Sequence, residues 1–324
     1  MKKYLLLTTF VLLASVTCLA GRKDAMQIDR YVYAVTEGDS LRMEVYTDPS
    51  LQFEGLRPCL FFVHGGGWDS DDNETSGRKW MRKMVAKGYV CVSIEYRQGI
   101  RRLRLGKAHI GDSPSFGDSY EYTIRIAVED TFDATRFLLG MADKYSIDTT
   151  KIIATGGSAG AINLTTAEYW ICNGEEIATS RLPEGFNYAA VIALAGGVWI
   201  RSTEQPEWKN NPCPFLLYHG DADQIVPYGS RIMEDCTFSA WGSSFLADQF
   251  DALQVPYMFV SGKDCDHAMS GLPFITNCDE MQSFLRRVVW DGERLSKRVT
   301  ETYLDEPRTI GYYMKHILRF KDEF

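Results

Sequence analysis

The sequence has few histidines and no closely paired cysteines, and both shortages narrow the chemistry it can support. Among its 324 residues there are five histidines, and none of its eight cysteines stands in a C-x-x-C pair. Structural zinc sites commonly use such a pair, so we predict no metal site. The chain also has no internal repeat and no low-complexity tract, which favours one large globular domain.

Positive charge is also in short supply. The 43 acidic residues exceed the 35 lysines and arginines, which gives a formal net charge of -8. An acidic protein is repelled by phosphate backbones and by anionic lipid, so we do not expect nucleic acid as a partner. A small-molecule or carbohydrate substrate is compatible with this charge, and the sequence leaves the oligomeric state open.

The first twenty residues have the pattern of a secretory signal peptide. Lys2 and Lys3 precede an apolar run from Leu5 to Ala14, which is short for a membrane span, and Ala20 is a small residue at the expected cleavage site. Removal of residues 1–20 would move the formal charge from -8 to -10, because both lysines are lost. In an alternative interpretation Cys18 is lipidated, the one case in which a membrane is a partner. Export to the periplasm or outside the cell is expected either way.

Without Cys18, an odd number of cysteines remains, so at least one thiol is unpaired or bonded to another molecule. Cys59, Cys91 and Cys213 lie in or beside apolar strands, where cysteine acts as a small hydrophobic residue. The other four are Cys172, Cys236, Cys265 and Cys278. The last three lie near polar loops, and an exported protein allows a disulfide among them.

Alternating apolar strands and amphipathic helices predict an α/β protein. After a β-hairpin over residues 28–47, the chain alternates between the two patterns, which indicates a mostly parallel sheet of about eight strands flanked by helices. The expected strands are 59–63, 90–94, 152–155, 190–195, 215–219 and 257–261, and the expected helices are 79–87, 124–141 and 245–253. The main domain would span residues 21–294, and residues 295–324 form an extension with no assigned role. Stretches 98–122 and 172–188 are expected to be irregular and to shape a substrate mouth.

Gly156-Gly157-Ser158-Ala159-Gly160 follows a predicted strand and opens a run of small and apolar residues. A G-x-S-x-G between a strand and a helix is typical of a nucleophile elbow, in which the serine occupies a strained turn and its neighbours must be small. Five residues of this composition also occur in ordinary turns. The pattern gains weight only from the residues that accompany it.

A second motif lies where an earlier strand ends, at His64-Gly65-Gly66-Gly67-Trp68. Glycines there allow backbone N–H groups to face a developing oxyanion. The expected donors are the amides of Gly66 and Gly67, together with that of Ala159 beside the nucleophile. His64 is expected to hold this loop rather than to act as a base.

A general base and its carboxylate partner are expected further along the chain. Asp221 and Asp223 follow a strand and both compete for the role of the acid, and His267 lies in a polar loop after the next strand. Of the five histidines, His267 alone follows these aspartates in such a loop, which gives the chain order Ser, Asp, His. His109 and His316 are expected at the surface or in packing.

Together these motifs resemble those of a secreted bacterial carboxylesterase of the α/β-hydrolase superfamily, over roughly Asp29 to Val289. The resemblance places the triad acid on Asp223 within His219-Gly220-Asp221-Ala222-Asp223-Gln224-Ile225-Val226-Pro227, and the base on His267. Tyr96-Arg97 also resembles the strand-end pair of such esterases. The implied catalytic residues are Ser158, Asp223 and His267, acting without metal or organic cofactor. Gln98-Gly99-Ile100 departs from the Pro-rich continuation of the hormone-sensitive-lipase branch.

The sequence says less about the substrate. Trp68 and Trp199 are candidates for lining the pocket, where their bulk would favour a small acyl group such as acetate. Export is compatible with acetyl-xylan or feruloyl esterase chemistry on polysaccharides. The basic run Arg101, Arg102, Arg104 and Lys107 has two interpretations, a contact with a uronic acid or a solvated loop. A serine peptidase and a catalytically inactive binding protein remain alternatives.

Overall fold

The computed structural model describes residues 26–70, 75–233, 237–303 and 306–312. The predicted signal peptide, with Cys18, lies outside the described residues, as do Cys236 and His316. No helix in the described part of the chain is long and apolar enough to cross a membrane.

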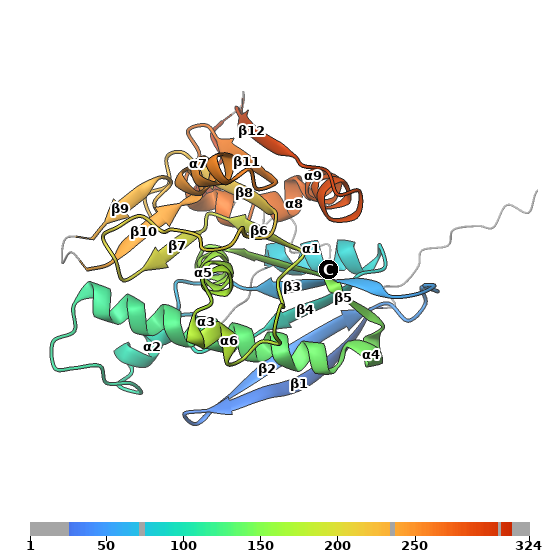
Figure 1. Ribbon diagram of the computed structural model, residues 1–324, viewed down its shortest axis with the longest axis horizontal. Coiled ribbons are helices and arrows are strands. Elements are labelled where there is room, and N and C mark those ends of the chain that lie inside the picture. Colours follow the sequence, from blue (N-terminus) through green and yellow to red (C-terminus); the bar gives the residue numbers. More distant parts are fainter. Residues whose placement is uncertain (1–25, 71–74, 234–236, 304–305, 313–324) are drawn as a thin grey trace, which may run out of the picture.

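A nine-stranded sheet forms the centre of the molecule, in the order β1-β2-β4-β3-β5-β6-β8-β11-β12 (Figure 1). The hairpin pairs antiparallel with β4, and every neighbouring pair from β4 to β12 is parallel. The bounds are β1 Gln27–Thr36, β2 Asp39–Thr47, β3 Arg57–Val63, β4 Val90–Ile94, β5 Ile147–Gly157, β6 Ala190–Leu194, β8 Phe215–Gly220, β11 Tyr257–Gly262 and β12 Ser296–Glu301. The mostly parallel sheet expected from the sequence is confirmed.

The ninth strand corrects the expected domain boundary at residue 294. Strand β12 lies within the segment 295–324, for which no role was expected, yet it pairs parallel with β11 along its whole length. Its residues are mostly exposed, because it is an edge strand. Because the strand is exposed, its sequence does not predict a strand: Ser296-Lys297-Arg298 has none of the apolar character of the central strands.

Three short strands form a second sheet that the sequence does not reveal. They are β7 Gly197–Ile200, β9 Ser230–Ile232 and β10 Ser239–Gly242, and β10 pairs antiparallel with both of the others. Strands of three or four residues are too short for a periodic pattern. This sheet carries Trp199 on β7.

Helices cover both faces of the large sheet and divide the core into two clusters. Buried side chains of α3, α5 and α7 pack on one face, and those of α1, α8 and α9 on the other (Figure 1). The helices are α1 Thr75–Val85, α2 Gly99–Arg104, α3 Phe116–Gly140, α4 Ala142–Tyr145, α5 Ala159–Asn173, α6 Glu176–Thr179, α7 Ser243–Leu253, α8 Pro273–Thr276 and α9 Cys278–Leu285, with short turns η1 His267–Ser270 and η2 Arg286–Trp290.

The stretches expected to be irregular are partly helical. Helix α2 and the first turns of α3 lie within residues 98–122, and α6 lies within residues 172–188. Ser115 accepts a hydrogen bond from the backbone N–H of Asp118, whose side chain accepts in turn from the backbone N–H of Ser115. This capping box fixes the start of α3 eight residues before the expected one.

The described cysteines are free thiols. Cys265 and Cys278 are buried and not bonded to each other, so a disulfide between this pair is excluded, while Cys236 lies outside the described residues. Burial raises the pKa of both thiols above the ordinary value. They therefore act as small core residues, like Cys59, Cys91 and Cys213.

Candidate active site

Ser158 stands at the junction of β5 and α5 in a strained turn. Its φ of 53° and ψ of -125° lie in a region that side-chain-bearing residues rarely adopt. A Cβ atom on Gly156 would lie 2.5 Å from the Val63 carbonyl oxygen, and one on Gly160 would collide with the same atom. The two glycines therefore allow the strand and the helix to approach β3, and the elbow has the geometry its motif predicts.

The structure brings the three predicted catalytic side chains into one chain of contacts. His267 Nε2 lies 2.9 Å from Ser158 Oγ, and His267 Nδ1 lies 2.7 Å from Asp223 Oδ2. Because the carboxylate can only accept, Nδ1 carries the ring proton, and Nε2 accepts a hydrogen bond from the Ser158 hydroxyl. The residues follow β5, β8 and β11, whose carboxyl ends meet at the same edge of the parallel sheet.

Asp223, and not Asp221, supplies the carboxylate that contacts His267. The Asp223 side chain is fully buried, and its Oδ1 accepts hydrogen bonds from the backbone N–H groups of Ile225 and Val226 at 2.8 and 3.0 Å. Asp221 instead accepts from the backbone N–H of Asp264 and pairs with Lys263. Of the two aspartates, the structure therefore places only Asp223 against His267.

A second histidine, which the sequence analysis passed over, stands behind the carboxylate. His219 is fully buried at the end of β8, with its Nε2 3.2 Å from the Val226 carbonyl oxygen and 3.4 Å from Asp223 Oδ2. Both neighbours are acceptors, so Nε2 carries a proton, while Nδ1 meets Ser243 Oγ at 2.9 Å. Its spacing four residues before Asp223 was the available signal.

The charge of Asp223 is stabilised by these neighbours. Burial alone would raise its pKa, but the hydrogen bonds and charges of His219 and His267 outweigh burial and hold the pKa well below the ordinary value of 3.8. Asp223 therefore stays ionised at neutral pH, as a partner for an imidazolium must be.

The glycine loop after β3 passes directly beside the nucleophile. A Cβ atom on Gly65 would lie 3.3 Å from Ser158 Cβ, and Gly66 and Gly67 have φ values of 110° and 62°. Ala159 is the first residue of α5, where backbone N–H groups have no partner within the helix. The three residues predicted to form an oxyanion hole thus belong to the two segments that flank Ser158.

His64 and Tyr96 hold this loop in place through hydrogen bonds and ring stacking. The Nδ1–H of His64 donates to the Gly65 carbonyl oxygen at 2.7 Å, and the His64 ring stacks on Tyr96 with a centroid distance of 4.5 Å. The Tyr96 hydroxyl donates to the His64 carbonyl oxygen at 2.9 Å. His64 is thus placed as a loop anchor, and the distances place His267, not His64, at the nucleophile.

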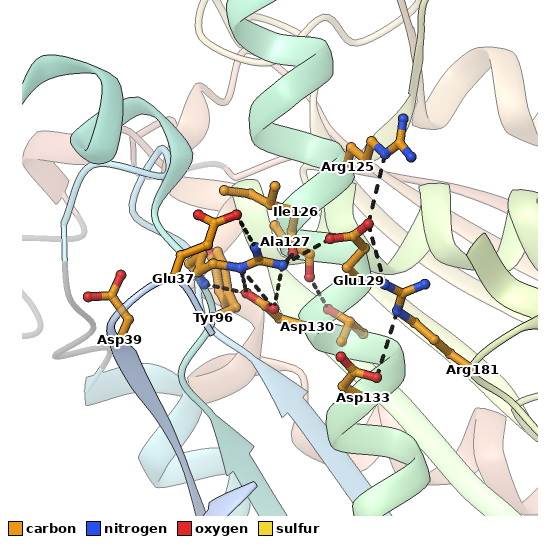
Figure 2. A network of polar contacts seen from close by, with 12 residues as sticks. Glu37, Asp39, Tyr96, Arg125, Ile126, Ala127, Glu129, Asp130, Asp133 and Arg181 are labelled. Atoms are coloured by element: carbon orange, nitrogen blue, oxygen red, sulfur yellow. Dashed lines mark hydrogen bonds and ion pairs between the residues drawn. The ribbon is translucent and has the colours of Figure 1, made fainter. Parts of the chain in front are cut away.

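Tyr96 is fixed in turn by a buried ionic network at Arg97, drawn in Figure 2. The Arg97 guanidinium contacts Asp130 at 2.9 Å and Glu129 at 3.0 Å on α3, and Glu37 at 3.2 Å on the hairpin turn. The backbone N–H of Arg97 also donates to Asp130. The network therefore ties the end of β4, and with it Tyr96, to α3.

We expect Tyr96→Phe to lower kcat for a short ester about tenfold with little change in KM, because the lost hydrogen bond releases the loop predicted to carry the oxyanion donors. The kinetics of the purified variant against p-nitrophenyl acetate measure this. Tyr89→Phe, at the opposite end of β4, is the matched control and should behave as wild type. An unchanged kcat in Tyr96→Phe would show that the bond does not position the loop.

Trp68 and Trp199 lie together in an aromatic cluster. Their ring centroids are 5.9 Å apart, and Tyr120 lies within 5.7 Å of each. Trp68 Nε1 donates to Asn163 Oδ1 on α5 at 2.9 Å, whereas the buried Trp199 Nε1 has no partner among the described residues. Both indoles are nearly fully buried, so neither presents an open face, and the cluster lies beside the glycine loop that ends at Trp68.

The basic run, which one interpretation makes a solvated loop, lies mostly in helix α2, and Arg104 and Lys107 are exposed. Arg102 is buried and pairs with Glu37 and Asp39, and Arg104 pairs with Asp69 at 2.7 Å. Lys107 reaches Asp39 at 3.7 Å. Among the described residues, no group of three or more His, Cys, Asp or Glu could hold a metal ion.

Parts of the sequence are similar to known proteins. A sequence family described as BD-FAE matches residues 43–102, which contain the glycine loop and Tyr96-Arg97. Arylacetamide deacetylase of Oryctolagus cuniculus is 29% identical over 136 residues, which cover 41% of this chain and 29% of that protein. Neutral cholesterol ester hydrolase 1 of Rattus norvegicus is 27% identical over 151 residues, 45% of this chain and 32% of that protein. The chain thus spans about a third of the length of these relatives.

Solved structures match over most of the chain. Esterase 2 of Thermogutta terrifontis has a TM-score of 0.58 at 19% identity, and the match covers 81% of this chain and 92% of that one. Its propionate-bound form gives a TM-score of 0.59. The chain has the α/β-hydrolase fold, as the sequence motifs predict.

Proposed function

We propose that the protein is a serine carboxylic ester hydrolase. The observation that carries the proposal is the continuous contact from Ser158 through His267 to the buried, ionised Asp223, at the carboxyl edge of an α/β-hydrolase sheet. The sequence relatives bear names of ester- and amide-cleaving enzymes, which supports acyl transfer. Ester cleavage is favoured by the glycine loop beside the elbow.

The mechanism follows from the proton positions. His267 Nε2 takes the Ser158 proton as Oγ attacks the ester carbonyl, and Asp223 stabilises the imidazolium that forms. The amides of Gly66, Gly67 and Ala159 hold the oxyanion. His267 then gives the proton to the departing alcohol, and water repeats the attack on the acyl-enzyme to release the acid and free Ser158.

We further propose a short acyl group, acetate first, carried on a polysaccharide. The support is the packed cluster of Trp68, Tyr120 and Trp199 beside the loop, which limits the room for a long acyl chain. The structural neighbour has been solved with propionate and with butyrate bound, which are small acids of this kind. Export by the segment 1–20 would place such an enzyme with extracellular carbohydrate.

An acyl-chain series tests the specificity. We expect kcat/KM for p-nitrophenyl acetate to exceed that for the octanoate at least about tenfold, because each methylene in a closed pocket already changes the barrier measurably. The matched anilide should react far more slowly than the acetate ester. Equal rates for ester and anilide would favour a peptidase, and faster octanoate cleavage would contradict the short acyl group.

The carbohydrate part of the ester is tested with a second panel of substrates. Acetylated and feruloylated oligosaccharides, scored by the released acid, separate the acetyl from the feruloyl alternative. Acetate release alone supports the proposal. Release of ferulate alone would move the assignment to a feruloyl esterase with the same catalytic residues.

A further inference from the structure

A cavity of about 900 Å³ lies between the hairpin β1–β2, the end of β4 and helix α2, away from Ser158. Seven arginines and lysines but only three aspartates and glutamates line it, in a chain whose net charge is -8. The excess of basic groups is therefore local and opposite to the charge of the whole molecule. A volume of this size suits a small organic ligand.

The basic side chains of the cavity are of two kinds. Arg97 and Arg102 are buried and held by several carboxylates, so they are not available to a ligand. Arg30 and Arg42 are more than half exposed and make single pairs with Glu44 and Glu95. Exposed pairs of that kind contribute little and can exchange for a ligand.

Arg78, in the first turn of α1, is exposed and has no ion pair with a described residue. Arg78 and Arg30 both act on the same phenol, Tyr46, where their charges oppose the rise in its pKa caused by burial and Glu44. Both guanidinium groups are therefore close enough to Tyr46 to act on it, and both arginines line the cavity. Together with Arg42 they offer a carboxylate several donors from different elements.

The cavity also has groups for hydroxyls. Gln98 is nine-tenths buried on its wall, its Nε2 donates to the Tyr96 carbonyl oxygen, and its Oε1 has no partner among the described residues. The lining carboxylates Asp39, Glu44 and Glu95 are further acceptors. A phosphate dianion, which brings acceptors and charge, would be repelled by them, whereas a sugar brings hydroxyl donors.

We propose that this cavity binds a sugar acid of the hexuronate type. Arg30, Arg42 and Arg78 pair with its carboxylate, and Gln98 and the acidic side chains accept hydrogen bonds from its hydroxyls. His64 and Tyr96 form part of the wall, and Gly65, next in the chain, lies against Ser158. The loop that begins at His64 therefore separates the cavity from the nucleophile. Binding of a ligand in the cavity does not require ester hydrolysis.

Calorimetric titration of the full-length Ser158→Ala variant tests the proposal without interference from catalysis. Glucuronate should bind saturably, and at least about tenfold more tightly than glucose, because the carboxylate adds charge-assisted hydrogen bonds. Inorganic phosphate should bind more weakly than glucuronate. Equal binding of glucose, tighter binding of phosphate, or no saturable binding of glucuronate would each overturn the proposal.

Charge variants locate the site. Arg78→Gln and Arg42→Gln should each weaken glucuronate binding about tenfold while leaving hydrolysis of neutral p-nitrophenyl acetate unchanged in an active background. Arg286→Gln removes the same charge from an arginine that is 80% exposed at the end of α9, outside the cavity, and should bind as the parent. An equal loss in all three variants would mean non-specific charge attraction and overturn the assignment.

Discussion

Replacing Ser158 with alanine is expected to lower kcat/KM for p-nitrophenyl acetate by about 10⁴-fold or more, because no other group in the described site can form the acyl-enzyme. The 2.9 Å contact between Ser158 Oγ and His267 Nε2 makes the serine hydroxyl the attacking group. The measurement is initial-rate kinetics of the purified variant, with thermal unfolding to show that the fold is intact.

Ser180→Ala is the matched control for this experiment. Ser180 is exposed in the turn after α6 and should keep wild-type activity. Hydrolysis by Ser158→Ala within tenfold of wild type would contradict the assignment of the nucleophile, since loss of a covalent nucleophile cannot be that mild.

Asp223→Asn is expected to lower kcat by about 10³ to 10⁴-fold with a small change in KM. The amide carries no charge to stabilise the imidazolium, and its NH₂ group can turn the His267 ring to the wrong tautomer. His219 adds to the defect, because its Nε2–H and the backbone donors of Ile225 and Val226 compete for the single remaining acceptor oxygen.

Asp221→Asn provides the control within the same turn. Asp221 binds Lys263 and the backbone of Asp264, so its amide variant should stay within a few-fold of wild type. The amide of Asp223→Asn has no carboxyl proton to lose, so raising the pH should not rescue this variant. A larger defect in Asp221→Asn than in Asp223→Asn would reverse the assignment of the acid.

The catalytic residues could be predicted from the sequence because each follows an apolar strand. Ser158 comes directly after β5, and Asp223 and His267 lie in the turns that follow β8 and β11, and parallel strands bring such positions to one edge. The glycine loop was readable for the same reason, since it ends β3. Motif order and strand ends thus predicted the juxtaposition that the distances now show.

Contacts between segments that are far apart in the sequence could not be predicted from it. The sequence motif names Tyr96-Arg97, but nothing local reveals that Arg97 meets Asp130 on α3 and Glu37 on the hairpin. His219 lies within the acid motif, yet only the fold shows that it packs behind Asp223. The exposed edge strand β12 and the short strands of the second sheet have no periodicity of their own, because their partners supply their stability.

Labelling with a fluorophosphonate probe, followed by mass spectrometry of the peptides, tests the central claim most directly. The probe reacts preferentially with an activated serine, and the structural neighbour is known in phosphorylated and phosphonylated forms. We predict a single modification on Ser158 in the wild type, and strongly reduced labelling in His267→Ala. Modification of another residue, or full esterase activity with Ser158 unmodified by the probe, would contradict the account.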